Sequence, residues 1–249
     1  MSKTVWITGA SSGIGREFAR RYARLGFRLI LTARRTDRLE ALTAELTVKY
    51  NTFCRILPAD LEQESECARL CEALADERLD IFINNAGFGV CGSFLETSGE
   101  KELSMAKVNV LAMHQLFKFA VKKMETQGFG TVLNVASSAG LLPGGPYMAG
   151  YYATKAYVVS LTRGVAEELR EQHSPVYVCA LCPGPVDTEF NDRADVVFAP
   201  VSYTHLAAGG PCGRRRPCGA VRPTSAPYSR PRPTRPPWPS TGCTTSTRP

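Results

Sequence analysis

The chain has 249 residues, of which 44% are apolar, and this is enough for one α/β domain with a buried core. Its formal net charge of +7 is concentrated after residue 200, where there are eight arginines and no lysine, aspartate or glutamate. The first 200 residues carry 22 basic and 23 acidic side chains and are nearly neutral, so the charge does not indicate a nucleic-acid-binding domain.

No apolar stretch reaches the roughly 18 residues that span a bilayer, so we expect no membrane segment. The first apolar run begins at Thr4, which leaves no room for the parts of a secretory signal. Six of the nine cysteines are scattered over the first 190 residues without framework spacing, as is typical of reduced thiols. These features predict a soluble cytoplasmic protein.

Short β-branched runs alternate along the chain with longer amphipathic stretches. Strand patterns cover residues 4–8, 28–33, 53–57, 80–84, 130–136 and 176–181, and helix patterns cover residues 14–25, 36–49, 65–75, 101–123 and 151–170. This alternation predicts a doubly wound, Rossmann-type α/β fold with a parallel sheet, with six strands in this chain. Ligands of such folds bind at the carboxyl ends of the strands, so the loops there should face one site.

A glycine-rich turn follows the first strand and opens a helix. Gly9 permits the tight turn, Gly13 lets backbone N–H groups approach a pyrophosphate, and Gly15 allows close helix packing. A turn without a ligand is the alternative. The residues predicted to bind a dinucleotide here are Gly9, Ser11, Ser12, Gly13, Ile14 and Gly15.

Tyr151 and Lys155 lie four residues apart on one predicted helix, so their side chains should be adjacent. Ser138 stands thirteen residues before Tyr151, at the end of the fifth strand. Only Tyr151 has a lysine four residues later, and the thirteen-residue spacing then selects Ser138, so we expect Ser137 and Tyr152 to be structural. The ammonium of Lys155 should favour the phenolate and lower the pKa of Tyr151.

These motifs, in this order, resemble those of the short-chain dehydrogenase/reductase family over about residues 3–190. The resemblance implies hydride transfer between NADP(H) and a small-molecule carbonyl or alcohol, with Tyr151 as general acid and base. It implies that Ser138 donates to the carbonyl oxygen and that Lys155 holds the nicotinamide ribose. It assigns to Asn109 a water beside Lys155, although a mid-helix Asn can also cap a local bend. The parent enzyme is expected to be a homodimer or homotetramer.

The end of the second strand bears on cofactor choice. Members of this family that are specific for NAD place an acidic residue near position 33, where this chain has Ala33. Arg34, with help from Arg35, is therefore predicted to select the 2′-phosphate of NADP. Asp60 and Leu61 resemble the pair that brackets the adenine ring, although Asp60 can alternatively act only as a helix N-cap.

Two further motifs complete the predicted cofactor site. Asn85, Ala86 and Gly87 match the family's Asn-Asn-Ala-Gly signature and are expected to form a wall beside the adenosine ribose. After the sixth strand, the residues expected near the nicotinamide are Pro183, Gly184, Val186 and Thr188. No metal site is predicted, because Cys179 and Cys182 lie on a strand pattern in which residues three apart point to opposite faces.

The resemblance stops near residue 190. The 49 residues after residue 200 hold ten of the 17 prolines, and a segment so poor in apolar periodicity should not form a core. Residues 200–206 match one reading frame of a transposon adapter used in sequencing libraries. We therefore interpret residues 1–199 as a truncated dinucleotide-binding and catalytic domain that lacks the family's seventh strand, and residues 200–249 as a disordered or artefactual tail.

The interrupted resemblance leaves a second hypothesis about function. Without the substrate-covering lobe and the seventh strand, the chain could be a catalytically dead fragment that at most binds dinucleotide. Nucleic-acid binding by the arginine-rich tail is disfavoured, because its charge has neither aromatic interleaving nor a folded scaffold.

Overall fold

The structure is a computed structural model that describes residues 2–185. Several sequence predictions fall outside these residues. They are the tail boundary at residues 199–200, the loss of a seventh strand, and the roles of Val186 and Thr188.

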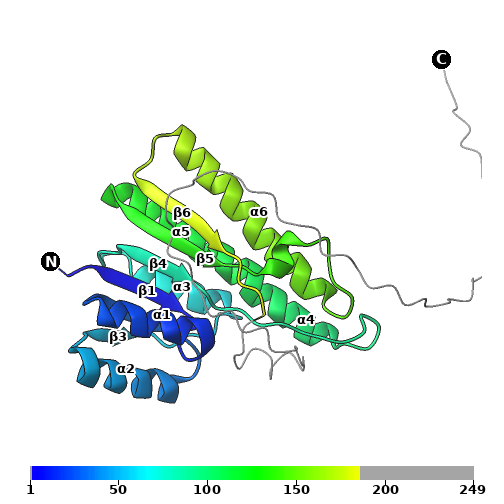
Figure 1. The fold of residues 1–249 in the computed structure, drawn as a ribbon, viewed down its shortest axis with the longest axis horizontal. Helices are drawn as coiled ribbons and strands as arrows, with labels where there is room; N and C mark the ends of the chain where they lie inside the picture. Colours follow the sequence, from blue (N-terminus) through cyan, green and yellow to red (C-terminus); the bar gives the residue numbers. More distant parts are fainter. Residues whose placement is uncertain (1, 186–249) are drawn as a thin grey trace, which may run out of the picture. The chain divides into compact units, whose positions relative to one another are not determined.

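The described residues form a parallel sheet of six strands in the order β3-β2-β1-β4-β5-β6 (Figure 1). Trp6 at the centre of β1 pairs with Ile30 of β2 on one side and Phe82 of β4 on the other. The chain reverses its direction of winding between β1 and β4, and ligands of such folds bind outside this point. The strands are β1 (Thr4–Thr8), β2 (Arg28–Thr32), β3 (Cys54–Ile56), β4 (Ile81–Asn84), β5 (Gly130–Val135) and β6 (Val176–Leu181).

Helices cover both faces of the sheet, which confirms the predicted doubly wound fold (Figure 1). Side chains alternate along β1, so that Val5 and Ile7 pack with α1 and α2, while Trp6 packs on the opposite face with α3, α5 and α6. Trp6 stacks on Phe82 with ring centroids 4.2 Å apart. The helices are α1 (Gly13–Arg24), α2 (Thr36–Tyr50), α3 (Glu64–Ala73), α4 (Gly99–Ala106), α5 (Met113–Gln127) and α6 (Ala149–Glu171).

The long helix expected over residues 101–123 contains a feature that the sequence did not predict. A π-helical segment, Lys107–Ala112, joins α4 to α5 and carries Asn109. In such segments the backbone hydrogen bonds join residues i and i+5, and the segments are frequent at functional sites. A short 3-10 helix, Ser138–Leu141, follows β5.

Within the described part of the chain, no helix is both long enough and apolar enough to cross a membrane. The same residues contain no group of three or more His, Cys, Asp or Glu side chains placed to hold a metal ion.

Candidate active site

A cleft lies along the carboxyl ends of the strands and passes the point where the winding reverses. Most of the residues predicted from sequence line it. They are Gly9, Ser11, Ser12, Gly13, Ile14, Arg34, Arg35, Asp60, Leu61, Asn85, Ala86, Gly87, Ser138, Tyr151, Lys155, Pro183 and Gly184. Gly15 and Asn109 do not line the cleft and support it from behind.

The glycine turn needs its glycines for two different reasons. Gly9 has a φ of +65°, in the left-handed region that favours glycine. Gly15 lies in the first turn of α1, where a Cβ atom would overlap the carbonyl oxygen of Gly9 and approach Asn85 Nδ2 to 2.6 Å. The helix can therefore begin directly against the turn, with its N-terminal N–H groups facing the cleft.

The loop after β4 is fastened to the end of β1. The backbone N–H groups of Asn85 and Ala86 both donate to Thr8 Oγ1, at 2.9 Å and 3.0 Å. The side chain of Asn85 donates to the Thr8 carbonyl at 2.9 Å. These contacts make the loop a rigid wall of the cleft.

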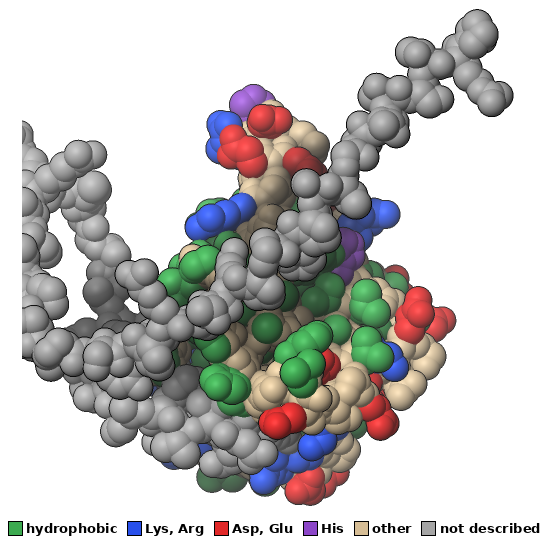
Figure 2. Space-filling model, turned by 90° about the vertical axis from the view of Figure 1, so that its right-hand side faces the viewer, with side chains coloured by type: hydrophobic (Ala, Val, Ile, Leu, Met, Phe, Trp, Pro, Cys, Tyr) green, Lys and Arg blue, Asp and Glu red, His purple; other side chains and the backbone are tan. Residues whose placement is uncertain are grey.

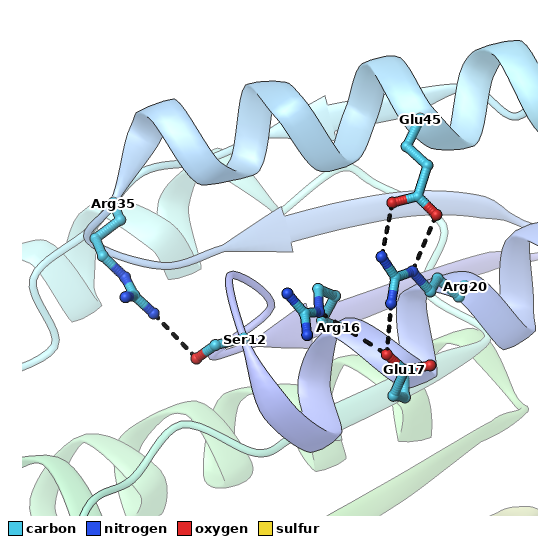
Figure 3. A network of polar contacts seen from close by, with 6 residues as sticks. All are labelled: Ser12, Arg16, Glu17, Arg20, Arg35 and Glu45. Atoms are coloured by element: carbon cyan, nitrogen blue, oxygen red, sulfur yellow. Dashed lines mark hydrogen bonds and ion pairs between the residues drawn. The ribbon is translucent and has the colours of Figure 1, made fainter. Parts of the chain in front are cut away.

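The two arginines after β2 lie in different surroundings. Arg35 Nη2 donates to the Ser12 hydroxyl at 3.0 Å (Figure 3). It also donates to the Ser11 hydroxyl at 3.2 Å, so this guanidinium lies over the glycine turn. Arg34 Nη1 instead donates to Glu62 Oε1 at 3.1 Å and lies 3.9 Å from Asp60 Oδ1. The structure thus places Arg35 against the glycine turn and Arg34 against the acidic loop after β3.

Tyr151 and Lys155 lie on the first turns of α6 and are 8% and 5% exposed. Lys155 Nζ donates to the Val135 carbonyl at 3.0 Å and lies 5.9 Å from the centre of the Tyr151 ring. Because burial disfavours its charged form, the pKa of Lys155 falls to about 8.

The expected lowering of the Tyr151 pKa is not found in the protein alone. Burial raises this pKa, and the hydrogen bond with the Ser137 side chain, which acts in the opposite direction, does not compensate. The phenol packs in an apolar cluster with Met105, Ala139 and Met148, where a phenolate would be poorly solvated. The loss of solvation therefore raises the Tyr151 pKa by more than the Ser137 hydrogen bond lowers it.

The serine beside Tyr151 differs from the one that the thirteen-residue spacing selects. The Ser137 side chain hydrogen-bonds the Tyr151 side chain, and its oxygen accepts from the Ala139 N–H at 3.2 Å. Ser138 begins the 3-10 helix, and its backbone N–H donates to the Pro183 carbonyl at 2.8 Å. Both serines line the cleft, and it is the Ser137 side chain that acts on the Tyr151 pKa.

The reason for the difference is the loop between β5 and α6. This loop turns at Gly144, with a φ of +92°, and at Tyr147, with a φ of +64°. A loop that folds back in this way can absorb one residue without moving either end. The number of residues between the serine and Tyr151 therefore does not fix which hydroxyl lies beside the phenol.

Asn109 lies in the π-helical segment and is 1% exposed. Its Oδ1 accepts from the Phe88 N–H at 3.0 Å, while its Nδ2 donates to the Phe88 carbonyl at 2.8 Å and to Thr154 Oγ1 at 3.1 Å. Both amide protons are thus engaged in joining the helix to the loop after β4 and to α6. The side chain thus bonds Phe88 and Thr154, and the water expected beside Lys155 stays a prediction.

Comparisons with known proteins agree with this geometry. A family model described as short chain dehydrogenase matches residues 3–195. The chain belongs to the short-chain dehydrogenase/reductase family. It is similar to D-beta-hydroxybutyrate dehydrogenase of Rhizobium meliloti, with 32% identity over 78% of this chain and 75% of that protein. It is also similar to the 3-oxoacyl-acyl-carrier-protein reductase FabG of Rickettsia bellii, with 31% identity over 77% of this chain and 76% of that protein.

Solved structures give the same result. A short-chain dehydrogenase from Sphingobium yanoikuyae in complex with NADPH has a TM-score of 0.74 and 36% identity, covering 78% of this chain and 75% of that one. A short-chain dehydrogenase/reductase from Burkholderia phymatum in complex with NAD has a TM-score of 0.72 and 31% identity, covering 78% of this chain and 70% of that one. This family member is therefore an oxidoreductase of the NAD(P)-dependent dehydrogenase/reductase type.

Beneath the cleft of this short-chain dehydrogenase/reductase lies a buried polar ladder that sequence reasoning missed. Asn84 Nδ2 donates to Asn134 Oδ1 at 3.1 Å and to the Met113 carbonyl at 3.0 Å. Asn134 Nδ2 donates to Thr162 Oγ1 at 2.9 Å. The ladder joins β4, β5, α5 and α6. Its sequence signal is an asparagine near the end of two neighbouring strands, where buried side chains are otherwise apolar.

Exposed apolar side chains lie on the loops after β4 and β5. Figure 2 shows apolar side chains gathered on the face of the molecule where the carboxyl ends of the strands and the start of α4 lie. The exposed large apolar residues of the loops after β4 and β5 are Phe94, Leu95, Leu141, Leu142 and Tyr147.

Proposed function

We propose that this short-chain dehydrogenase/reductase uses NADP(H) to interconvert a carbonyl and an alcohol on a small-molecule substrate, with Tyr151 as the general acid and base. One observation carries the proposal. Tyr151 and Lys155 lie at one end of a cleft whose other end holds the glycine turn and Arg35.

The residues lining the cleft fit an extended dinucleotide. The glycine turn and the N-terminus of α1 would hold the pyrophosphate, because unpaired N–H groups and the helix dipole favour an anion there. Asp60 and Leu61 would contact the adenine, and the loop containing Asn85, Ala86 and Gly87 would form the ribose wall. Pro183 and Gly184, with Lys155, would lie at the nicotinamide end. When bound, the nicotinamide supplies or accepts the hydride.

A 2′-phosphate is supported by the charges after β2. Position 33 holds an alanine and not a carboxylate, and the Arg35 fork with the Ser11 and Ser12 hydroxyls offers several donors within one corner of the cleft. A guanidinium is well matched to a phosphate because its planar fork donates two parallel hydrogen bonds. The preference for NADP(H) over NAD(H) is therefore part of the proposal.

The chemistry at the other end is proton transfer. The Tyr151 hydroxyl would donate its proton to the carbonyl oxygen as negative charge develops there, and take it back in the reverse reaction. Lys155, with Nζ fixed by the Val135 carbonyl, would stabilise the phenolate and hold the ribose. Burial of both side chains excludes water from the proton that is transferred.

We assign the serine role to Ser137 rather than to Ser138. The Ser137 side chain acts on the Tyr151 phenol in the direction that lowers its pKa, and its oxygen accepts from the Ala139 N–H. A carbonyl oxygen that receives the Tyr151 proton would lie within reach of the same hydroxyl, which then stabilises developing oxyanion charge. Asn109 is assigned a positioning role, since its side chain fastens Phe88 and Thr154.

The test is turnover of the full 249-residue chain with NADPH and with NADH on a panel of ketones and aldehydes. We expect a higher kcat/KM with NADPH. Arg35→Ala should weaken NADPH binding by about tenfold and leave NADH binding within about twofold, because it removes one charge-assisted contact to the phosphate alone. Binding of NADPH without any turnover would favour the catalytically dead fragment. Sedimentation velocity tests the predicted homodimer or homotetramer.

A further inference from the structure

The first arginine after β2, Arg34, is held by an acidic side chain that none of the motifs contains. Arg34 Nη1 donates to Glu62 Oε1 at 3.1 Å. The Arg34 side chain is 48% exposed and the Glu62 side chain is 24% exposed. Arg34 lines the cleft and Glu62 does not, so the ion pair joins a residue of the cleft lining to one outside it.

The position of Glu62 is set by the turn after β3. The Asp60 carboxylate accepts from the Glu62 backbone N–H at 3.3 Å, and this local turn sends the Glu62 side chain back toward β2. The same Asp60 carboxylate lies 3.9 Å from Arg34 Nη1. Two carboxylates of one turn therefore face the same nitrogen of Arg34.

The formal charges of the four side chains Arg34, Arg35, Asp60 and Glu62 cancel. Arg34 and Arg35 contribute two positive charges, and Asp60 and Glu62 contribute two negative charges. A 2′-phosphate brings about −1.5 to −2 charges near neutral pH, so its binding requires Arg34 to share or release its carboxylate partners. A 2′-hydroxyl brings no charge and does not compete for the guanidinium. Glu62 therefore opposes the phosphorylated cofactor and not the unphosphorylated one.

Resting on the function proposed above, we propose that Glu62 is a specificity-determining residue that reduces the preference for NADPH over NADH by competing with the 2′-phosphate for Arg34. The chain then combines a phosphate-binding Arg35 with a partly neutralised Arg34. Such a site binds both cofactors with a narrower difference in affinity than two unpaired arginines would give.

The test is the dissociation constant of NADPH and of NADH, measured by titration calorimetry on the full chain with Glu62→Gln. The amide keeps the size of the side chain and removes its charge. NADPH should bind about three- to fivefold more tightly, as expected for loss of a partly exposed competing ion pair, and NADH binding should not change. The matched control is Glu64→Gln, which removes a charge from the exposed first turn of α3 and should change neither constant.

A second variant separates the route of the effect. In an Arg34→Ala background, Glu62→Gln should no longer strengthen NADPH binding, because there is no guanidinium left to release. An undiminished effect in that background, an equal effect on NADH, or weaker NADPH binding by Glu62→Gln alone would overturn the inference. Failure of the unaltered chain to bind either cofactor would instead refute the proposed function.

Discussion

The buried amino group of Lys155 should make the stability of this protein rise with pH. Its pKa in the folded chain is about 8, whereas an unfolded lysine titrates near about 10.4. Between these two values the unfolded chain binds more protons than the folded one, so the free energy of unfolding increases with pH. Below the folded value the cost of burying the charge is fully present. It is about 3 kcal/mol, since each tenfold change in protonation corresponds to about 1.4 kcal/mol.

Lys155→Met removes this charge and keeps most of the side-chain volume. At pH 7 the variant should gain up to about 3 kcal/mol of stability over the unaltered chain, because the buried charge is removed. Loss of the hydrogen bond to the Val135 carbonyl should reduce this gain by about 1 kcal/mol. This difference should shrink by about 2 kcal/mol between pH 8 and pH 10, as the native lysine loses its proton and its penalty.

Urea denaturation of both proteins at a series of pH values measures the difference directly, because all other titrating groups are common to both. Lys118→Met, at an exposed position on α5, controls for loss of a lysine without burial. A stability difference between Lys155→Met and the unaltered chain that stays constant from pH 7 to pH 10 would refute the argument.

Two further predictions concern the serines and the glycine turn. Ser137→Ala should lower kcat/KM for carbonyl reduction about a hundredfold, while Ser138→Ala should change it by less than about fivefold. A larger loss of kcat/KM in Ser138→Ala than in Ser137→Ala would instead support Ser138, the serine selected by the thirteen-residue spacing. Gly15→Ala should lower the free energy of unfolding by about 2–3 kcal/mol, because its Cβ would overlap the Gly9 carbonyl. Gly164→Ala, on α6, should instead raise the free energy of unfolding by about 0.5–1 kcal/mol, because its Cβ would enter open space. Thermal unfolding measures both variants, and equal changes in stability would contradict the role given to packing at Gly15.

Local patterns determined the sheet. The predicted bounds of β1 and β6 agree with the structure, and the other four strands differ from the prediction by one residue at one or both ends. Along the chain, β-branched runs alternate with stretches of helical periodicity, as is typical of a parallel sheet buried on both faces. This signal depends only on residues that are near one another in sequence. The same holds for the glycine turn, whose residues are contiguous in sequence.

Features that depend on distant contacts were not predictable. The π-helical segment places Asn109 against Phe88 and Thr154, and nothing in residues 107–112 alone distinguishes it from an α-helix. The pairing of Arg34 with Glu62 requires two loops to meet across the sheet edge. The direction in which the Tyr151 pKa shifts depends on how completely the fold buries the phenol.

Single-turnover reduction of a carbonyl substrate by the full chain with NADPH tests the role of Tyr151 as proton donor most directly. Tyr151→Phe should slow the reaction by about a thousandfold or more, as expected for loss of the proton donor and of one hydrogen bond to the developing oxyanion. NADPH binding should stay within about twofold, since the phenyl ring preserves the wall of the cleft. Reduction at an unchanged rate in Tyr151→Phe would contradict the account.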